Sequence, residues 1–156
     1  MKSIRLASYL LAATLLTISC NSQGNNDEVI PTSTIPKNII QTFENQFSGV
    51  EQAEWSKEDD LYEVEFKMGD LEYEAAFNSN GETIAIEVKI DRAHLPDAVN
   101  EYLDKNYPNT IFEDIEKVTN NNGYFYEIEG EENGKEFELL FDGNGNFLKT
   151  VVEKND

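Results

Sequence analysis

Side chains that could carry nucleophilic or acid–base chemistry are few in this sequence. His94 is the only histidine and lies in the segment DRAHLP, and Cys20 is the only cysteine. No serine has the setting of a nucleophile elbow, and none stands near the histidine by motif. We therefore expect no catalytic residue, no cofactor and no enzymatic activity, with His94 at the surface.

One segment has part of the spacing of a calcium-binding loop. Asp142, Asn144, Asn146 and Glu153 stand at positions 1, 3, 5 and 12 of such a loop, but position 6, where glycine makes the sharp turn, is Phe147. The same segment alternates as a strand does, so a hairpin turn is the better interpretation. We expect no dedicated metal site here.

Carboxylates are the reactive groups that this sequence has in excess. It holds 31 acidic and 12 basic residues, a formal net charge of −19. Phosphate contact needs a basic patch, so we expect neither nucleic acid nor anionic lipid headgroups as partners. Acidity often serves solubility alone, so the positions of the carboxylates on the fold have to decide whether they bind anything.

The start of the chain indicates export. Lys2 and Arg5 precede an apolar run from Leu6 to Ile18, which is typical of a secretory signal and too short to span a membrane. The run ends at Cys20, at the junction with a polar segment.

This start resembles bacterial lipoprotein signals. Ser19 fits the small residue expected before a lipidated cysteine, whereas Thr17 departs from the usual Leu or Val. We expect a signal peptide over residues 1–19, acyl chains on Cys20, and a flexible tether without secondary structure over residues 20–34.

A hairpin cassette occurs twice in the remaining chain. YEVEFKMGDLEYEAAFNSNGETIAIEV runs from Tyr62 to Val88, and YEIEGEENGKEFELLFDGNGNFLKTVV runs from Tyr126 to Val152, aligned without a gap at an offset of 64. Apolar and polar residues alternate in three stretches of each copy. This pattern predicts three antiparallel strands with one face on a core and one face open.

A helix and a first strand precede each cassette. Pro36 and Pro96 suit a first helical turn, and apolar residues follow them at helical spacing. First strands are expected near residues 50–57 and 111–118. Four inserted residues in the second copy, around residues 119–123, predict a longer hairpin loop there.

These elements predict an α+β fold. It is a tandem repeat of one helix plus four antiparallel strands. Repeat 1 is expected over residues 35–91 and repeat 2 over residues 92–156.

Turn residues set the register of the predicted sheet. Two-residue turns are expected at Gly69–Asp70, Asn80–Gly81 and Asn133–Gly134. They predict that Phe66 faces Tyr73, that Phe77 faces Ile84, and that Phe141 faces Tyr126 and Leu148.

The same register gathers outward side chains into rows, and like charges directly opposite each other destabilise a sheet. In the first copy the row is Glu65, Glu74 and Glu87. In the second copy Glu129 lies by Glu138 and Val151, Glu127 lies by Leu140, and Phe125 and Phe147 are close by. A solvated polar face is the plainer interpretation of these rows. The functional interpretation is a partner-binding surface made of all ten residues, with apolar side chains ringed by charge.

From Pro36 onwards the sequence resembles the PepSY-like family of lipoproteins, whose fold is similar to the beta-lactamase inhibitor protein. The resemblance lies in the repeated helix openings at Ile35–Pro36 and Leu95–Pro96, the FSG and YPN helix ends, the YEVEF and YEIEG strands, and the NG hairpins after Phe77 and Phe141. It implies two helix-plus-four-strand repeats forming one continuous antiparallel sheet with both helices on one face. It also implies a concave open face, which clamps a partner enzyme in the inhibitor, and a cell-envelope location.

The expected function is a non-catalytic, lipid-anchored binding or inhibitor-like module of a Gram-negative envelope, in the periplasm or at the outer membrane. Its partner would be an envelope protein, with a protease as one option by resemblance, and it would touch the membrane only through its anchor. The inhibitor's repeats are each tied by a disulfide, whereas neither repeat here contains cysteine, which argues against a beta-lactamase as the target. The alternative is a protein that binds calcium or a small ligand through the acidic rows.

Overall fold

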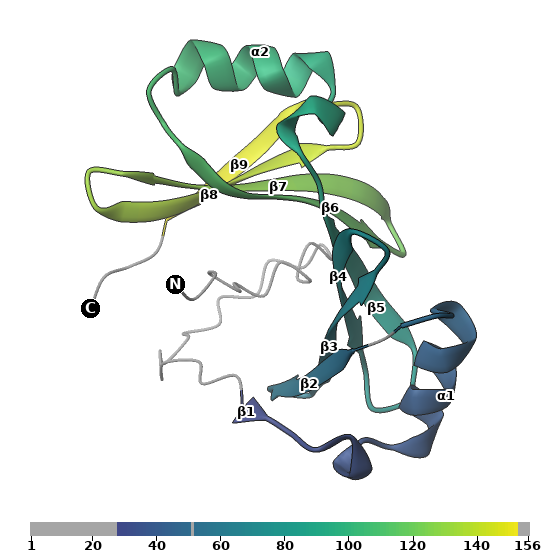
Figure 1. The fold of residues 1–156 in the computed structure, drawn as a ribbon. Helices are drawn as coiled ribbons and strands as arrows, with labels where there is room; N and C mark the ends of the chain where they lie inside the picture. The colour runs from purple at the N-terminus through teal and green to yellow at the C-terminus, as the bar shows by residue number, and fades with distance from the viewer. Residues whose placement is uncertain (1–27, 51, 153–156) are drawn as a thin grey trace. The chain divides into compact units, whose positions relative to one another are not determined.

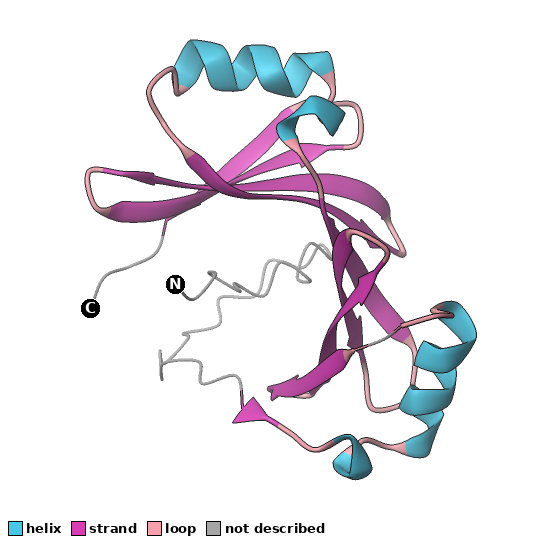
Figure 2. Ribbon diagram, in the orientation of Figure 1, coloured by secondary structure: helices cyan, strands magenta, loops and turns pink. Residues whose placement is uncertain are grey.

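The computed structural model describes residues 28–50 and 52–152, which form an α+β fold (Figures 1 and 2). The predicted signal peptide, Cys20 and the first part of the predicted tether lie outside the described residues. The elements are β1 (Glu28–Val29), the 3-10 helix η2 (Thr32–Thr34), α1 (Lys37–Gln46), β2 (Ala53–Glu58), β3 (Leu61–Met68), β4 (Leu71–Phe77), β5 (Thr83–Lys89), η3 (Arg92–His94), α2 (Asp97–Asn106), β6 (Phe112–Asn120), β7 (Gly123–Glu132), β8 (Lys135–Asp142) and β9 (Phe147–Val152).

Neighbouring strands in the sheet follow the order of the chain, from β1 to β9. Antiparallel pairing joins β1 to β2, β2 to β3, β3 to β4, β6 to β7, β7 to β8 and β8 to β9. The chain forms two compact units, an N-terminal unit that ends at Ala85 and a C-terminal unit that begins at Ile86.

Aromatic rings build the core of the N-terminal unit. Helix α1 begins directly after Pro36, as predicted. The ring of Phe43 on this helix lies edge-on to Trp55 at 5.4 Å, to Phe66 at 5.1 Å and to Phe77 at 6.5 Å between centroids. Each such pair is worth about 0.5–1.5 kcal/mol beyond the area it buries. The helix is therefore held mainly by its contact with the strands.

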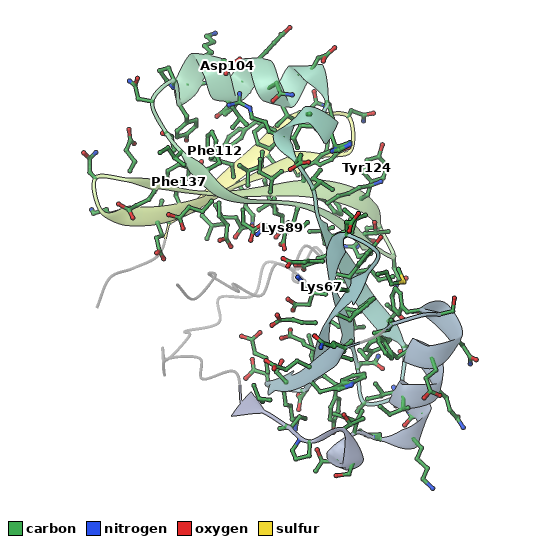
Figure 3. All side chains as sticks on the ribbon, viewed as in Figure 1. Lys67, Lys89, Asp104, Phe112, Tyr124 and Phe137 are labelled. Carbon is green, nitrogen blue, oxygen red and sulfur yellow. The ribbon has the colours of Figure 1, made fainter. Side chains whose placement is uncertain are left out.

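The core of the C-terminal unit is more aliphatic. Helix α2 begins after Pro96 and buries Val99 and Leu103. The other core residues are Leu95, Ile115, Tyr126, Ile128, Phe137, Leu139 and Phe141. Aromatic stacking occurs at the margin of this core, where Tyr107 lies 5.2 Å from Phe137, and Figure 3 shows Phe112 and Phe137 between α2 and the strands.

Two of the predicted turns are confirmed. Met68 pairs with Leu71, which makes Gly69 and Asp70 the central residues and places Phe66 opposite Tyr73. Asn133 and Gly134 have φ angles of 56° and 75°, as a type I′ turn requires.

The predicted pairing of Phe141 with Leu148 is wrong by one residue. The register shifts between Leu140 and Phe141, so that Phe141 pairs with Phe147. Asp142 explains the shift: its Oδ1 accepts hydrogen bonds from the backbone N–H groups of Asn144 and Asn146, both at 2.9 Å. These bonds make a wider turn than the two-residue turn that the Asn-Gly pair suggests.

The long loop predicted at residues 119–123 is also wrong. Asn120 pairs with Gly123, which leaves a two-residue turn, and Val118 pairs with Phe125. The four inserted residues therefore lengthen each strand of the hairpin by two residues, because added pairs satisfy backbone hydrogen bonds that a loop would leave to water.

The last part of the predicted tether is structured. Glu28 and Val29 pair with β2, and the N–H of Ile30 donates to the carbonyl oxygen of Trp55 at 2.8 Å. The β-branched pair Val29–Ile30 favours strand pairing, a signal that the polar composition around it hides.

Candidate functional site

Carboxylates gather on the face of the C-terminal unit that points away from α2. Core residues such as Ile115 and Ile128 pair with each other on the helix side, so their neighbours along β6 and β7 point to the other side. We call the resulting set of carboxylates the acidic face; it consists of Asp114, Glu116, Glu127, Glu129 and Glu138, of which Glu127 (8% exposed) and Glu138 (4% exposed) are buried.

The register places these carboxylates opposite one another on three strands. Glu116 pairs with Glu127, and Asp114 pairs with Glu129. Glu129 in turn pairs with Glu138 on β8. Like charges directly opposite destabilise a sheet by a few tenths of a kcal/mol or more each, so this arrangement opposes folding rather than supporting it.

Glu129 shows the effect of this crowding most clearly. Burial raises the pKa of its carboxyl, and the negative charges of Asp114, Glu116, Glu138 and Glu136 raise it further, from 4.5 to about 7. At neutral pH the side chain is therefore divided between its protonated and ionised forms. A cation brought to this face would favour the ionised form.

One basic side chain already reaches the margin of the acidic face. The Nζ of Lys89 lies 2.6 Å from Oδ2 of Asp114, and Figure 3 shows Lys89 on the side of the strands away from α2. This ion pair shows how an ammonium group is accommodated beside the row.

The outward face of the N-terminal unit is also acidic. Glu65 pairs with Glu54 and with Glu74, which extends the predicted row by one residue. Lys67 forms an exposed ion pair with Glu72 at 2.6 Å. Glu54, Glu65 and Lys67 line a shallow hollow of about 470 Å³. Glu87, the third residue of the predicted first row, belongs to the C-terminal unit and is buried on β5, on the same side of that strand as Lys89 two residues later.

The apolar members of the predicted partner-binding surface do not form one exposed patch; they are Phe125, Leu140, Phe147 and Val151. Leu140 lies between Glu127 and Lys149 but is only 3% exposed. Val151 pairs with Glu138, and Phe125 is half-buried between Val118 and Asp142.

Phe147 lies on the opposite face. Its ring stacks on Tyr102 of α2 at 4.8 Å and meets Phe141 of the core at 5.7 Å. The one-residue shift beside Phe141 is the cause, because such a shift moves a side chain to the other side of the sheet. Placing Phe147 on the outward face was therefore wrong.

Asp114 and Glu116 were missed because β6 was not included in the predicted rows. The hairpin turn at residues 121–122 was the missing signal, since it places Glu116 beside Glu127. The same register places Asp114 beside Glu129, and the bulge at Glu113 lies one residue beyond this pair, between Phe112 and Asp114.

His94 has no catalytic setting. It ends η3, is exposed, and donates its backbone N–H to the carbonyl oxygen of Asp91.

Asp142 accepts a hydrogen bond from the side chain of Asn146 at 2.9 Å, which holds the pKa of its carboxyl below the ordinary value. The segment with part of the calcium-loop spacing therefore forms a hairpin turn, as predicted, and the carboxylate of Asp142 accepts hydrogen bonds from residues of that turn.

Neither a metal-binding cluster nor a spanning helix is found in the part of the chain that the structure describes. Across residues 28–50 and 52–152, no three Asp, Glu, His or Cys side chains are placed to hold a metal ion. No helix within those residues is long and apolar enough to cross a membrane.

A family model matches most of the chain. The family described as "Putative beta-lactamase-inhibitor-like, PepSY-like" matches residues 22–72 and 60–149, one range for each half. A search among curated proteins found no match.

Solved structures share the fold at low sequence identity. A DUF2874 family protein from Bacteroides ovatus matches with a TM-score of 0.70 and 20% identity, over 76% of this chain and 88% of its own. A BLIP-like protein from Bacteroides fragilis matches with a TM-score of 0.67 and 19% identity, over 78% and 88%. One of the "putative periplasmic proteins" from Bacteroides eggerthii matches with a TM-score of 0.70 and 14% identity, over 75% and 88%.

Proposed function

The chain belongs to the beta-lactamase-inhibitor-like, PepSY-like family, and we propose that it is a non-catalytic binding or inhibitor-like module of the cell envelope. In this proposal the outward face of the sheet contacts a protein partner, and Cys20 carries a lipid anchor that holds the module to the membrane. The two units are, in the same proposal, copies of one helix-plus-four-strand repeat.

The acidic face is the observation that carries the proposal. Carboxylates placed opposite one another oppose folding, and their charges add to the larger effect of burial in raising the pKa of Glu129. A basic surface on a partner would relieve the repulsion when it binds, so the strain in the free protein becomes part of the binding free energy. An envelope protein with exposed Lys or Arg fits this chemistry, and a protease of the envelope is one such candidate.

Affinity capture tests the proposal directly. The purified protein is immobilised, envelope extract is passed over it, and captured proteins are identified and then measured singly for affinity. The double variant Glu116→Gln/Glu129→Gln, at two half-buried positions of the face, should weaken binding of the captured partner by about tenfold or more, as loss of charge pairs at an interface does. The control Glu44→Gln/Glu101→Gln makes the same change of charge on the exposed sides of α1 and α2 and should bind as the wild type does.

Equal binding by the acidic-face variant and the wild type would remove this face from the proposal.

Mass spectrometry of the N-terminus tests the anchor separately, since a diacylated or triacylated Cys20 is expected and an unmodified one would contradict it. No observation favours the cation-binding alternative.

A further inference from the structure

Glu129 lies at the middle of the acidic face. It stands on β7 with Asp114 directly opposite on β6 and Glu138 directly opposite on β8. The Cβ atoms of residues that face each other on adjacent strands lie about 4.5–5.5 Å apart. The three carboxylates therefore form one row across three strands, and a negative charge on Glu129 is repelled from both sides.

Charged groups reach Glu129 from each neighbouring strand, and all but one are acidic. They are Asp114 and Glu116 from β6, Glu136 and Glu138 from β8, Glu127 and Glu131 two residues away on β7, and Lys89 from β5, whose Nζ lies 2.6 Å from Oδ2 of Asp114. Lys89 is thus engaged at the Asp114 end of the row. Ionisation of Glu129 adds a further negative charge to this group.

The N-terminal unit has a row with the same arrangement but a different exposure to water. Glu65 lies between Glu54 and Glu74 on three adjacent strands. Its side chain is exposed, whereas that of Glu129 is half-buried. Water and salt screen the repulsion between exposed charges. The register alone therefore does not single out Glu129; the register together with burial does.

Burial and the neighbouring carboxylates both favour the protonated form of Glu129, and they raise its pKa to about 7. With this pKa, about one-tenth of the Glu129 side chains are ionised at pH 6 and about nine-tenths at pH 8. The charge of the acidic face therefore changes by nearly one unit over this range of pH.

We propose that a proton on Glu129 regulates the acidic face, which binds the basic surface of a partner when Glu129 is ionised and loses that proton to solvent as the partner binds. An ammonium or guanidinium group beside the row offsets the repulsion from both sides and so stabilises the ionised carboxylate. By reciprocity, a partner that displaces a proton binds more tightly as the pH rises. This inference rests on the proposed function for its surface and partner, and it adds the pH dependence of their binding.

Hexalysine, acetylated at its N-terminus and amidated at its C-terminus, is the probe, because its ammonium groups stay charged from pH 6 to pH 8. Its affinity for the full chain is measured by calorimetry. The wild type should bind about tenfold more tightly at pH 8 than at pH 6, in proportion to the ionised fraction of Glu129. At pH 7, titrations in two buffers that differ in ionisation enthalpy should show release of about half a proton for each peptide bound.

Two variants assign this dependence to one carboxyl group. Glu129→Gln cannot ionise, so its affinity should be nearly the same at pH 6 and pH 8 and the proton release should disappear. Glu65→Gln removes the central carboxylate of the exposed row in the N-terminal unit and is the matched control. It should keep the tenfold ratio between the two affinities.

The outcomes separate this inference from the proposed function. Peptide binding that is equal at pH 6 and pH 8, or a pH dependence that persists in Glu129→Gln, overturns the inference and leaves the proposed function standing. A pH dependence that is lost in Glu65→Gln assigns it to the other row and also overturns the inference. Absence of peptide binding at every pH removes the acidic face as a surface for basic partners, so that the proposed function and the inference fall together.

Discussion

Each of the two units packs a helix on antiparallel strands, but the two cores differ in their side chains. Phe43 of α1 and Leu103 of α2 are 60 residues apart and both face the strands. Phe43 meets four aromatic rings, whereas Leu103 packs in a core of mainly aliphatic side chains. The outer strand of the N-terminal unit is covered by β1, and that of the C-terminal unit is exposed. The two units therefore both bury apolar side chains between a helix and strands, but they differ in the kind of core side chain and in whether the outer strand has a neighbour.

The largest expected difference lies in the cores. Phe43→Ala should lower the free energy of unfolding by about 4 kcal/mol and Leu103→Ala by about 3 kcal/mol, since a larger buried side chain leaves a larger cavity. Urea unfolding measures both values. A loss at Leu103 that equals or exceeds the loss at Phe43 would break the comparison between an aromatic and an aliphatic core.

A smaller difference is expected at the glycines of two turns that lie 64 residues apart in the sequence. Gly81 and Gly145 have φ angles of 81° and 83°, and a Cβ at Gly145 would lie 3.2 Å from side-chain atoms of Ala98 and Val99. At Gly81 the nearest atom, at 2.9 Å, is the side-chain nitrogen of Asn38, which can rotate away, and the backbone carbon and oxygen of Asn38 lie slightly further off at 3.3 Å. With left-handed strain of about 1–2 kcal/mol at either position, we expect about 1 kcal/mol of lost stability for Gly81→Ala and about 2 kcal/mol for Gly145→Ala.

Thermal melting of both glycine variants checks this order. Equal losses would mean that the turn strain alone decides the cost and that the contact with α2 contributes nothing.

The acidic face makes a pH-dependent prediction for the C-terminal unit. The pKa of Glu129 is raised from 4.5 to about 7, so between these values the folded state binds more protons than the unfolded state. Stability from this group is present below pH 4.5 and is lost as the pH rises through about 7. Glu129→Gln removes that loss, so at pH 8 the variant should be more stable than the wild type by about 1 kcal/mol, after allowance for partial solvent screening.

Melting at pH 4 and pH 8 tests the sign. The groups that face Glu129 are Asp114 and Glu116 from β6 and Glu138 and Glu136 from β8. Glu136→Gln is the control. Of these four charges Glu136 raises the pKa of Glu129 least, so its removal should give a smaller gain in stability at pH 8. A variant that is less stable than the wild type at pH 8 would show that the face does not oppose folding.

The smallest expected difference concerns two ion pairs of equal length. Lys67–Glu72 and Lys89–Asp114 both measure 2.6 Å, but Asp114 has only 19% of its side chain exposed, against 53% for Glu72. Water and salt screen the more exposed pair further. Lys89→Gln should cost about 0.5 kcal/mol and Lys67→Gln close to zero. Measuring both variants again in 1 M salt should reduce the difference between their losses of stability. If that difference stays the same, it arises from packing of the lysine side chains and not from charge.

Features set by neighbouring residues could be predicted from the sequence. Pro36 and Pro96 mark where the helices begin, and the turns at Gly69 and Asn133 fix the register of their hairpins. Each depends on a backbone preference that the residue carries by itself.

Features that depend on a choice between two local solutions could not be predicted. The Asn-Gly pair after Phe141 favours a two-residue turn, but Asp142 offers the backbone a competing set of hydrogen bonds, and Phe147 moves to the helix side as a result. The bulge at Glu113, which shifts the pairing of Phe112, likewise arises only once β6 pairs with β7. The acidic face depends on the two-residue turn at residues 121–122, where a longer loop was predicted.

The order of the strands has a kinetic consequence. Because each strand pairs with the strand next to it in the chain, most hairpins close over short separations in sequence, and no strand has to wait for a distant partner. Folding rates rise as contacts become closer in sequence. We therefore expect rapid folding for a protein so rich in sheet, with little time for unpaired strands to meet other chains.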